Sequence, residues 1–343
     1  MDSHYLASLI MYGVFLFAII AYITLDGFDM GVGCLHLFAK GDTERRIMIN
    51  SIGPVWDGNS TWIVIGGGVL FAAFPKAFST LAPNLYTPFM LMLFGFMLRA
   101  VSIEFRGKGH TERWKFMWDR AFFLASLVLA IMVGVIMGNL ITGMPLNDQG
   151  VVEGGLLTLL KPYPLLIALF GLSVFMMHGA IYLLMKTEGE FHDKMRLWAR
   201  RLISVFLILW FTSTFATFVA QPHMIEPFRD YPIIGALPIL SFICILMILR
   251  KVNQKKDGMA FLYSCLTIFF LMALFAIGIF PNIVFSTINP EQNSLTFMNS
   301  AVSTKALWIM VAVSCTGAPL SFFYFPYIFR VFRGKVKLDT LSY

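Results

Sequence analysis

Charged side chains are scarce in this chain. Asp, Glu, Lys and Arg make up 13% of its 343 residues, whereas soluble domains carry about 25%. Histidine and cysteine are also rare, at six and four residues. The cysteines lie in separate apolar segments and form no C-x-x-C or Cys/His cluster, which argues against a zinc site or a disulfide framework. With 58% hydrophobic residues, the composition indicates a membrane protein without a sizeable soluble domain.

The sequence also lacks the features of a cleaved secretory signal and of a nucleic-acid-binding protein. No Lys or Arg precedes the first apolar run, so a cleaved secretory signal is not expected and the first span should be retained. No basic tract is present that would indicate a nucleic-acid partner. The net charge of +7 comes from basic residues in short loops between apolar runs, which is a signal of membrane topology.

Apolar segments long enough to cross a membrane recur along the chain. A helix needs about 20 apolar residues to span the hydrocarbon core. The qualifying segments are residues 5–37, 51–73, 80–104, 116–142, 163–185, 202–222, 231–249, 259–281 and 306–329. The sequence therefore predicts an all-α polytopic membrane protein with nine transmembrane helices, in a single transmembrane domain over residues 1–343.

The basic residues predict the orientation. Of the 26 Lys and Arg residues, 21 lie in or beside loops on one side, four lie on the other side, and Arg99 lies within a span. Positive charge is retained on the cytoplasmic side of a membrane. We therefore expect the N-terminus outside and the C-terminus in the cytoplasm.

Three acids lie inside apolar segments, where lipid should exclude them: Asp26, Asp29 and Asp57. A carboxylate at mid-bilayer costs about 2.5–3.5 kcal/mol on insertion scales, so these acids imply a polar path or a buried partner. Asp26 and Asp29 are three residues apart and share a helix face. Arg99 is the natural ion-pair partner for one of the acids.

Two more titratable side chains accompany the acids. Glu104 lies near the end of the third span and His178 lies in the fifth. With the orientation above, the three acids, Arg99, Glu104 and His178 all fall in the cytoplasmic half, whereas the outer half has amides and hydroxyls such as Asn139 and Thr142. An acid cluster that opens to one side is what a proton-entry path needs.

Structural interpretations stand beside the proton path. Asp26 and Asp29 could bond to amides near the neighbouring glycines or pair statically with Arg99. Asp57, between a proline and a glycine, could cap a broken helix. His178 could be a haem ligand or a hydrogen-bonded interhelical residue, and so few span histidines argue against a multi-haem site in this chain.

Nine short motifs are recognisable between residues 20 and 190, in a consistent order and spacing. They are Thr24–Gly33, Thr43–Pro54, Trp56–Asn59, Leu70–Pro75, Leu98–Arg99, Glu104–Arg106, Gly138–Leu140, His178–Ala180 and Lys186–Glu190. Together they resemble subunit II of the cytochrome bd quinol oxidases. Beyond residue 190 the resemblance rests on length and hydropathy.

The resemblance implies a fold and a partner. The fold would be two four-helix bundles plus a peripheral helix, with the first bundle at about residues 5–142 and the second bundle and last helix at about 163–330. The partner would be the homologous subunit I, which carries haems b and d and the quinol site, with a small accessory subunit in some complexes. The complex, in the bacterial inner membrane, would oxidise quinol and reduce dioxygen to water.

The resemblance also implies roles for residues. This chain would ligate no haem and no metal, and a structural quinone has been associated with this subunit in some members. Asp57 matches the family aspartate assigned to a proton pathway. Asp26, Asp29 and Glu104 are further candidates for that pathway from their positions in the spans alone. The candidate supporting residues are Arg99, Trp56, Asn59 and His178.

Without the resemblance, the residues leave a second functional class open. A proton-coupled secondary transporter also has intramembrane acids and broken helices. It would show inverted repeats with matching polar breaks in both halves, and the second half of this chain lacks such breaks.

Overall fold

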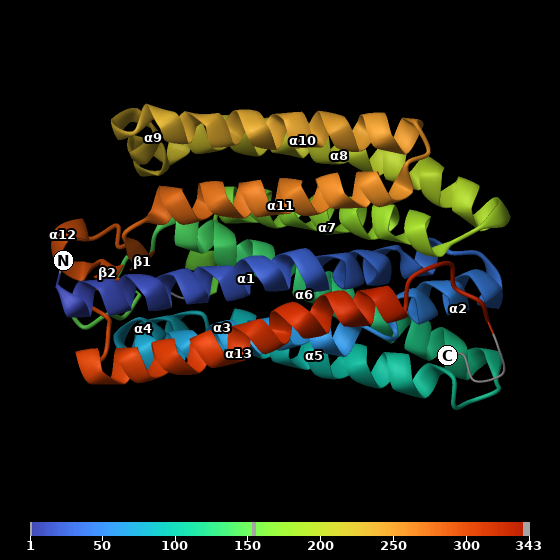
Figure 1. Ribbon diagram of the computed structural model, residues 1–343, viewed down its shortest axis with the longest axis horizontal. Helices are drawn as coiled ribbons and strands as arrows, with labels where there is room; N and C mark the ends of the chain where they lie inside the picture. The colour runs from blue at the N-terminus through green and yellow to red at the C-terminus, as the bar shows by residue number, and fades with distance from the viewer. Residues whose placement is uncertain (1, 153–155, 339–343) are drawn as a thin grey trace.

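Long helices run side by side along one axis of the molecule (Figure 1). The computed structural model describes residues 2–152 and 156–338. Its long helices are α1 Ser3–Leu35, α3 Trp56–Ala73, α5 Tyr86–Arg106, α6 Glu112–Thr142, α7 Pro162–Lys186, α8 Gly189–Ala220, α10 Ala236–Asn253, α11 Asp257–Ile279 and α13 Thr304–Val331. The prediction of an all-α fold is confirmed.

Short elements close the two ends of the bundle. They are α2 Gly41–Ile52, α4 Pro75–Asn84, α9 Glu226–Asp230, α12 Pro290–Asn293, the 3-10 turns η1 His36–Phe38, η2 Leu156–Leu159, η3 Pro222–Met224 and η4 Pro232–Gly235, and the antiparallel strands β1 Asn282–Val284 and β2 Leu295–Thr296. The strands, α4 and the N-terminus lie at one end, which we call the strand end. The helix α2 lies at the other (Figure 1), which we call the basic end because the Lys- and Arg-rich loops are there.

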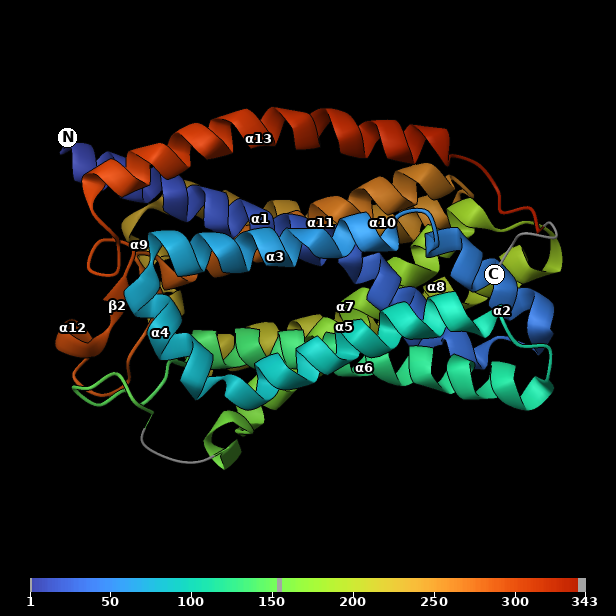
Figure 2. The same ribbon diagram turned by 90° about the horizontal axis from the view of Figure 1, so that it is seen from below.

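The number of membrane crossings stays a prediction. Within residues 2–152 and 156–338, eight helices are long and apolar enough to span a membrane. The predicted span that is not among these eight is the second, 51–73, which corresponds to α3, and α3 lies alongside α1 (Figure 2). Polar residues in its first turns and a run of three glycines lower its mean hydropathy, so α3 does not qualify by composition.

An interruption of the helical structure between α2 and α3 sets where α3 begins. The segment 51–73, predicted as one span, is interrupted after α2 ends at Ile52 and before α3 begins at Trp56. Pro54 lies in the interruption and lacks the amide hydrogen that a continuous helix needs. Asp57 therefore lies in the first turn of α3 at the basic end, closer to the helix terminus than a continuous span would place it.

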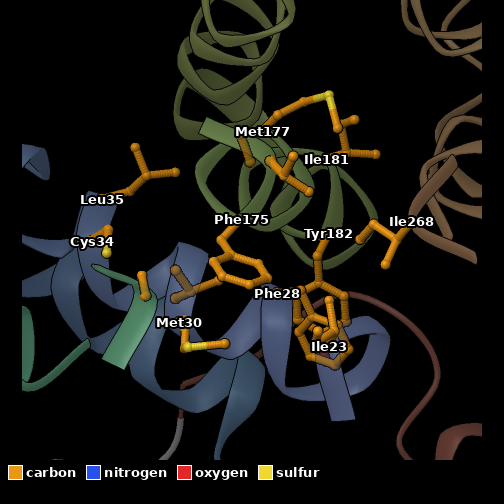
Figure 3. Close-up of a cluster of buried hydrophobic side chains, with 14 of the residues drawn as sticks. Ile23, Phe28, Met30, Cys34, Leu35, Phe175, Met177, Ile181, Tyr182 and Ile268 are labelled. Carbon is orange, nitrogen blue, oxygen red and sulfur yellow. The ribbon is translucent and has the colours of Figure 1, made fainter. Parts of the chain in front are cut away.

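The helices α1 and α7 cross at very short range. A Cβ added to Gly31 would overlap the carbonyl oxygen of Phe175, and one added to Gly179 would lie 2.6 Å from the carbonyl carbon of Gly31. Only glycine allows such an approach of two backbones. Around the crossing, Phe28 of α1 stacks on Tyr182 of α7 with ring centroids 4.1 Å apart (Figure 3).

The crossing joins the two predicted bundles into one core. A continuous hydrophobic cluster contains buried residues from Ala18 of α1 to Ile279 of α11. The last long helix, α13, packs along α1. Only 11% of its most apolar 18-residue stretch is buried within the structure. The division at residues 142 and 163 therefore stays a prediction, while α13 has the exposed position expected of a peripheral helix.

Candidate functional site

A buried ion pair joins α1 to α5. Arg99 donates from Nη1 to Oδ2 of Asp26 at 3.0 Å and from Nη2 to Oδ1 at 2.6 Å. Both side chains are fully buried. The two parallel hydrogen bonds make this a bidentate pair, the strongest geometry available to arginine and a carboxylate. Of the acids on α1, Asp26 is thus the one that Arg99 neutralises.

Asp29 has an amide partner instead of a cation. Asn59 of α3 donates from Nδ2 to Oδ2 of Asp29 at 2.8 Å and to the backbone oxygen of Leu25 at 3.2 Å. The other carboxyl oxygen of Asp29 is buried and has no hydrogen-bond partner in the described part of the chain. A buried carboxylate without a cation is far less stable than a paired one, so Asp29 is the better of the two acids to carry a proton.

Asp57 is not brought to this cluster. It lies exposed in the first turn of α3, and its backbone oxygen accepts from the hydroxyls of Ser60 and Thr61 at 2.9 and 3.1 Å. Val55 is the N-terminal cap of α3, with no side-chain hydrogen bond. The carboxylate of Asp57 therefore does not perform the capping role considered from sequence, and it faces outward with Thr61.

The remaining sequence candidates occupy separate positions. Glu104 lies exposed on α5, near the basic end. Trp56 is partly buried and packs against the main hydrophobic cluster. The structure thus assembles Asp26, Asp29, Asn59 and Arg99 into one buried group, and leaves Asp57 and Glu104 on the surface of α3 and α5.

His178 is fully occupied by neighbours within the chain. Its Nδ1 lies 2.8 Å from the hydroxyl of Ser264, and its Nε2 lies 3.0 Å from the backbone oxygen of Thr24. Its ring stacks on Phe261 with centroids 5.0 Å apart. With both ring nitrogens engaged and an aromatic ring against one face, this site does not fit a haem iron.

A second buried cluster, at the basic end, was missed by sequence reasoning. Asp119 of α6 accepts hydrogen bonds from His36 at 2.7 Å, from Arg45 at 2.9 Å, and from Nε of Arg106. Asp119, His36 and Arg106 are almost fully buried. The signal in the sequence was Asp119 itself, an acid at the eighth position of a long apolar helix.

This cluster continues to the start of α2. Asp42 accepts from Nη2 of Arg106 at 2.8 Å and from Lys115 at 3.2 Å. Partial burial opposes ionisation of Asp42, but these hydrogen bonds and the two positive charges outweigh it and lower the pKa of the carboxyl. The short helix α2 is therefore held to α5 and α6 by charged contacts.

An apolar cavity of about 370 Å³ lies between α1, α3, α5 and α6. Tyr22 and Phe96 line it. Phe96 also contacts Arg99, whose guanidinium carbon is 5.4 Å from the ring centroid, so the cavity approaches the Asp26–Arg99 pair. Within the described residues, no group of three His, Cys, Asp or Glu side chains is arranged to hold a metal ion.

Known proteins resemble the chain over almost its whole length. The family model described as cytochrome bd terminal oxidase subunit II matches residues 7–332. Cytochrome bd-I ubiquinol oxidase subunit 2 of Escherichia coli (strain K12) is 31% identical, with 94% of this chain and 93% of that protein covered. Cytochrome bd ubiquinol oxidase subunit 2 of Bacillus subtilis (strain 168) is 28% identical, with 93% of each covered.

A solved structure has the same fold. It is a chain of the bd oxidase from Geobacillus thermodenitrificans, with a TM-score of 0.79, 16% sequence identity, and 95% of this chain and 98% of that chain covered. The transporter alternative is not favoured by any of these comparisons. Since the family model covers nearly all residues, the chain belongs to the cytochrome bd terminal oxidase subunit II family, as its motifs predicted.

Proposed function

We propose that this chain is the subunit II that ligates no haem in a bacterial, membrane-bound quinol:oxygen oxidoreductase. In that complex a homologous subunit I carries haems b and d, oxidises quinol and reduces dioxygen to water. The family match over residues 7–332 carries this proposal. The engagement of both ring nitrogens of His178 supports placing the haems in the partner. The role of this chain is then to stabilise subunit I and to conduct protons towards it.

The exposed face of α3 is our candidate for the contact with subunit I. Asp57, Thr61, Val64 and Phe71 lie on this face, and Val64 and Phe71 are 70% and 61% exposed. A carboxylate facing lipid would cost about 2.5–3.5 kcal/mol. A protein partner that offers Asp57 a polar neighbour or water removes that cost. On α5, Phe94 and Met97 are also exposed, at 63% and 54%.

The partner and its contact face can be tested together by measuring haem per mole of this chain after mild-detergent purification. Val64→Trp enlarges the proposed contact face and should lower the haem ratio at least severalfold. Ile208→Trp, on a residue of α8 that is 66% exposed, is a similar enlargement on a helix outside the proposed contact face and should retain haem. Haem retained by isolated subunit II would contradict the proposal, and equal ratios in the two variants would exclude this face.

Protons would enter from the basic end. Asp57 of α3 and Glu104 of α5 lie near that end, outside the buried pair. Asp29, which makes no ion pair within residues 2–152 and 156–338, can hold a proton in the interior, while Asp26 is occupied by Arg99. We propose Asp57 as the surface relay towards subunit I, with Glu104 as a second surface acid and Asp29 as an interior proton-holding site.

This route requires the basic end to face the cytoplasm. The 21-to-four distribution of Lys and Arg residues predicts that orientation. A reporter that is active only in the cytoplasm, fused after Tyr343, should be active, although residues 339–343 lie outside the described part of the structure. Activity of a periplasm-specific reporter at that position would reverse both the topology and the direction of proton entry.

The apolar cavity is our candidate site for a structural quinone. Its lining is almost entirely aliphatic and aromatic, which suits an isoprenoid tail better than a polar ligand. Gly67 lines the cavity, and a Cβ added there would meet nothing within 4 Å, so Gly67→Leu should fill the space without disturbing the helix. Quinone extracted from the purified complex should fall severalfold.

Gly317→Leu is the matched control for this prediction. Gly317 lies on α13, away from the cavity lining and from the proposed contact face, is exposed and also has open space at its Cβ position. Its substitution should leave the quinone content unchanged. An undiminished quinone content in Gly67→Leu would place the quinone elsewhere in the complex.

A further inference from the structure

A polar pocket of about 390 Å³ opens at the basic end, between the start of α2 and the start of α6. Four cations line it: Arg45, Arg106, Arg113 and Lys115. Three acids also line it: Asp42, Glu112 and Asp119. The charge of the ligand that the pocket can bind therefore depends on which of these side chains already pair with one another.

The acids are occupied by some of these cations. Asp119 forms ion pairs with Arg45 and Arg106, and Asp42 forms ion pairs with Arg106 and Lys115. The third acid, Glu112, lies 3.4 Å from Lys115 and has a side chain that is 85% exposed, so solvent screens it strongly. None of the three acids therefore presents an unscreened negative charge to the pocket.

Arg113 and Arg45 retain N–H groups that could donate hydrogen bonds to a ligand. Arg113 has no ion-pair partner among residues 2–152 and 156–338. Arg45 donates from Nη1 to Asp119, and its side chain, which lines the pocket, is 22% exposed. Arginine presents planar, divergent donors that match the oxygens of a phosphate group. The pocket therefore has the donors for an anion.

The mouth of the pocket continues onto an apolar strip of α6. Phe116 lines the pocket and is 44% exposed. Met117 and Leu124 follow at helical spacing and are 48% and 52% exposed. Arg120 covers the ring of Phe116, with its guanidinium carbon 3.9 Å from the centroid. An arginine-lined pocket joined to such a strip can accept a charged headgroup and the acyl chains attached to it.

We propose that this pocket binds the phosphodiester headgroup of an anionic phospholipid. Arg113 binds the phosphate oxygens with the partly exposed guanidinium of Arg45 beside it, and the acyl chains lie along Met117 and Leu124 of α6. Basic pockets between membrane helices at the membrane surface are suited to such headgroups. The bound lipid would brace α2 against α6, where the protein's own contacts are charged side chains at the membrane boundary.

The purified two-subunit complex, with phosphatidylglycerol added and bound lipids counted by native mass spectrometry, tests the site. Each basic residue near a membrane surface contributes about 1 kcal/mol to anionic-lipid binding, so Arg113→Gln should weaken the tightest phosphatidylglycerol site about fivefold. Arg113 is exposed, and its substitution leaves the buried network intact. Glu112→Gln removes an acid from the same rim and should strengthen binding.

Matched controls separate this site from general surface charge. Arg201→Gln makes the same charge change at an exposed position of α8 and should leave the tightest site unchanged. An equal loss in Arg113→Gln and Arg201→Gln, or no loss in either, overturns the proposal.

A third binding experiment distinguishes a bound lipid from a bound free anion. Inorganic phosphate added to delipidated complex should bind more weakly than phosphatidylglycerol, because it lacks the acyl chains that contact α6. Phosphate that binds as tightly as the lipid, with the same dependence on Arg113, would identify a free-phosphate site and refute the lipid assignment. Phosphatidylcholine, which has the phosphodiester but no net charge, should not occupy the tightest site.

Discussion

Arg99→Met is expected to destabilise the complex more than any other single change at the site. The substitution leaves the Asp26 carboxylate fully buried without the cation that now gives it two hydrogen bonds. Breaking a buried pair by removing one partner costs about 3–5 kcal/mol. We expect a clear fall in the thermal unfolding temperature of the detergent-solubilised complex, or loss of assembled complex from the membrane.

Removing both partners provides the control. In the variant that combines Arg99→Met with Asp26→Leu, no charge is left unpaired, and replacing a buried pair by apolar side chains is often close to neutral. The double variant should therefore be more stable than Arg99→Met alone, and the difference measures the coupling of the pair. Additive losses of stability would show that the pair is not an energetic unit.

The same double variant separates two interpretations of Asp26. If Asp26 and Arg99 form a static ion pair, an assembled double variant should retain most of its quinol oxidase turnover. If Asp26 takes part in proton transfer, turnover should fall although the complex is assembled and contains haem. Asp29 makes no ion pair within residues 2–152 and 156–338 and is therefore better suited than Asp26 to carry a proton, so we expect the first result.

Asp57→Asn is expected to lower oxygen-reduction turnover about tenfold or more while the complex assembles with full haem. Asparagine preserves the shape and hydrogen-bonding capacity of the side chain but removes its titratable proton, and a well-placed acid–base group contributes about 10²–10⁴-fold to a proton-transfer step. The carboxylate neither caps α3 nor belongs to the buried cluster. Its loss should therefore affect rate and not folding.

The control for Asp57 lies one helical turn away. Thr61→Val removes a hydroxyl from the same exposed face of α3 but no proton that titrates, so turnover should stay close to that of the unaltered protein. Quinol oxidation at the unaltered rate in Asp57→Asn would refute the relay. Loss of assembled complex in Asp57→Asn would instead assign Asp57 a role in binding subunit I.

The amino-acid sequence by itself determined the class, the family and the chemical types present at the site. Scarce charge and long apolar runs are properties of composition, so they predict membrane helices without knowledge of packing. The cost of charge in lipid singled out Asp26, Asp29 and Asp57, and the rarity of span cations singled out Arg99. Residues close in sequence also revealed the motifs of subunit II.

The tertiary structure alone decided which groups meet. Arg99 pairs with Asp26 and Asn59 with Asp29, because the rotation of α3 and α5 about their own axes sets which acid each side chain reaches. The break at residues 53–55 turns Asp57 outward, although its position in sequence suggested an interior acid. His36, Arg45 and Asp119 come from three separate elements. Spacing along one helix carries no information about such contacts, because they depend on the packing of several helices at once.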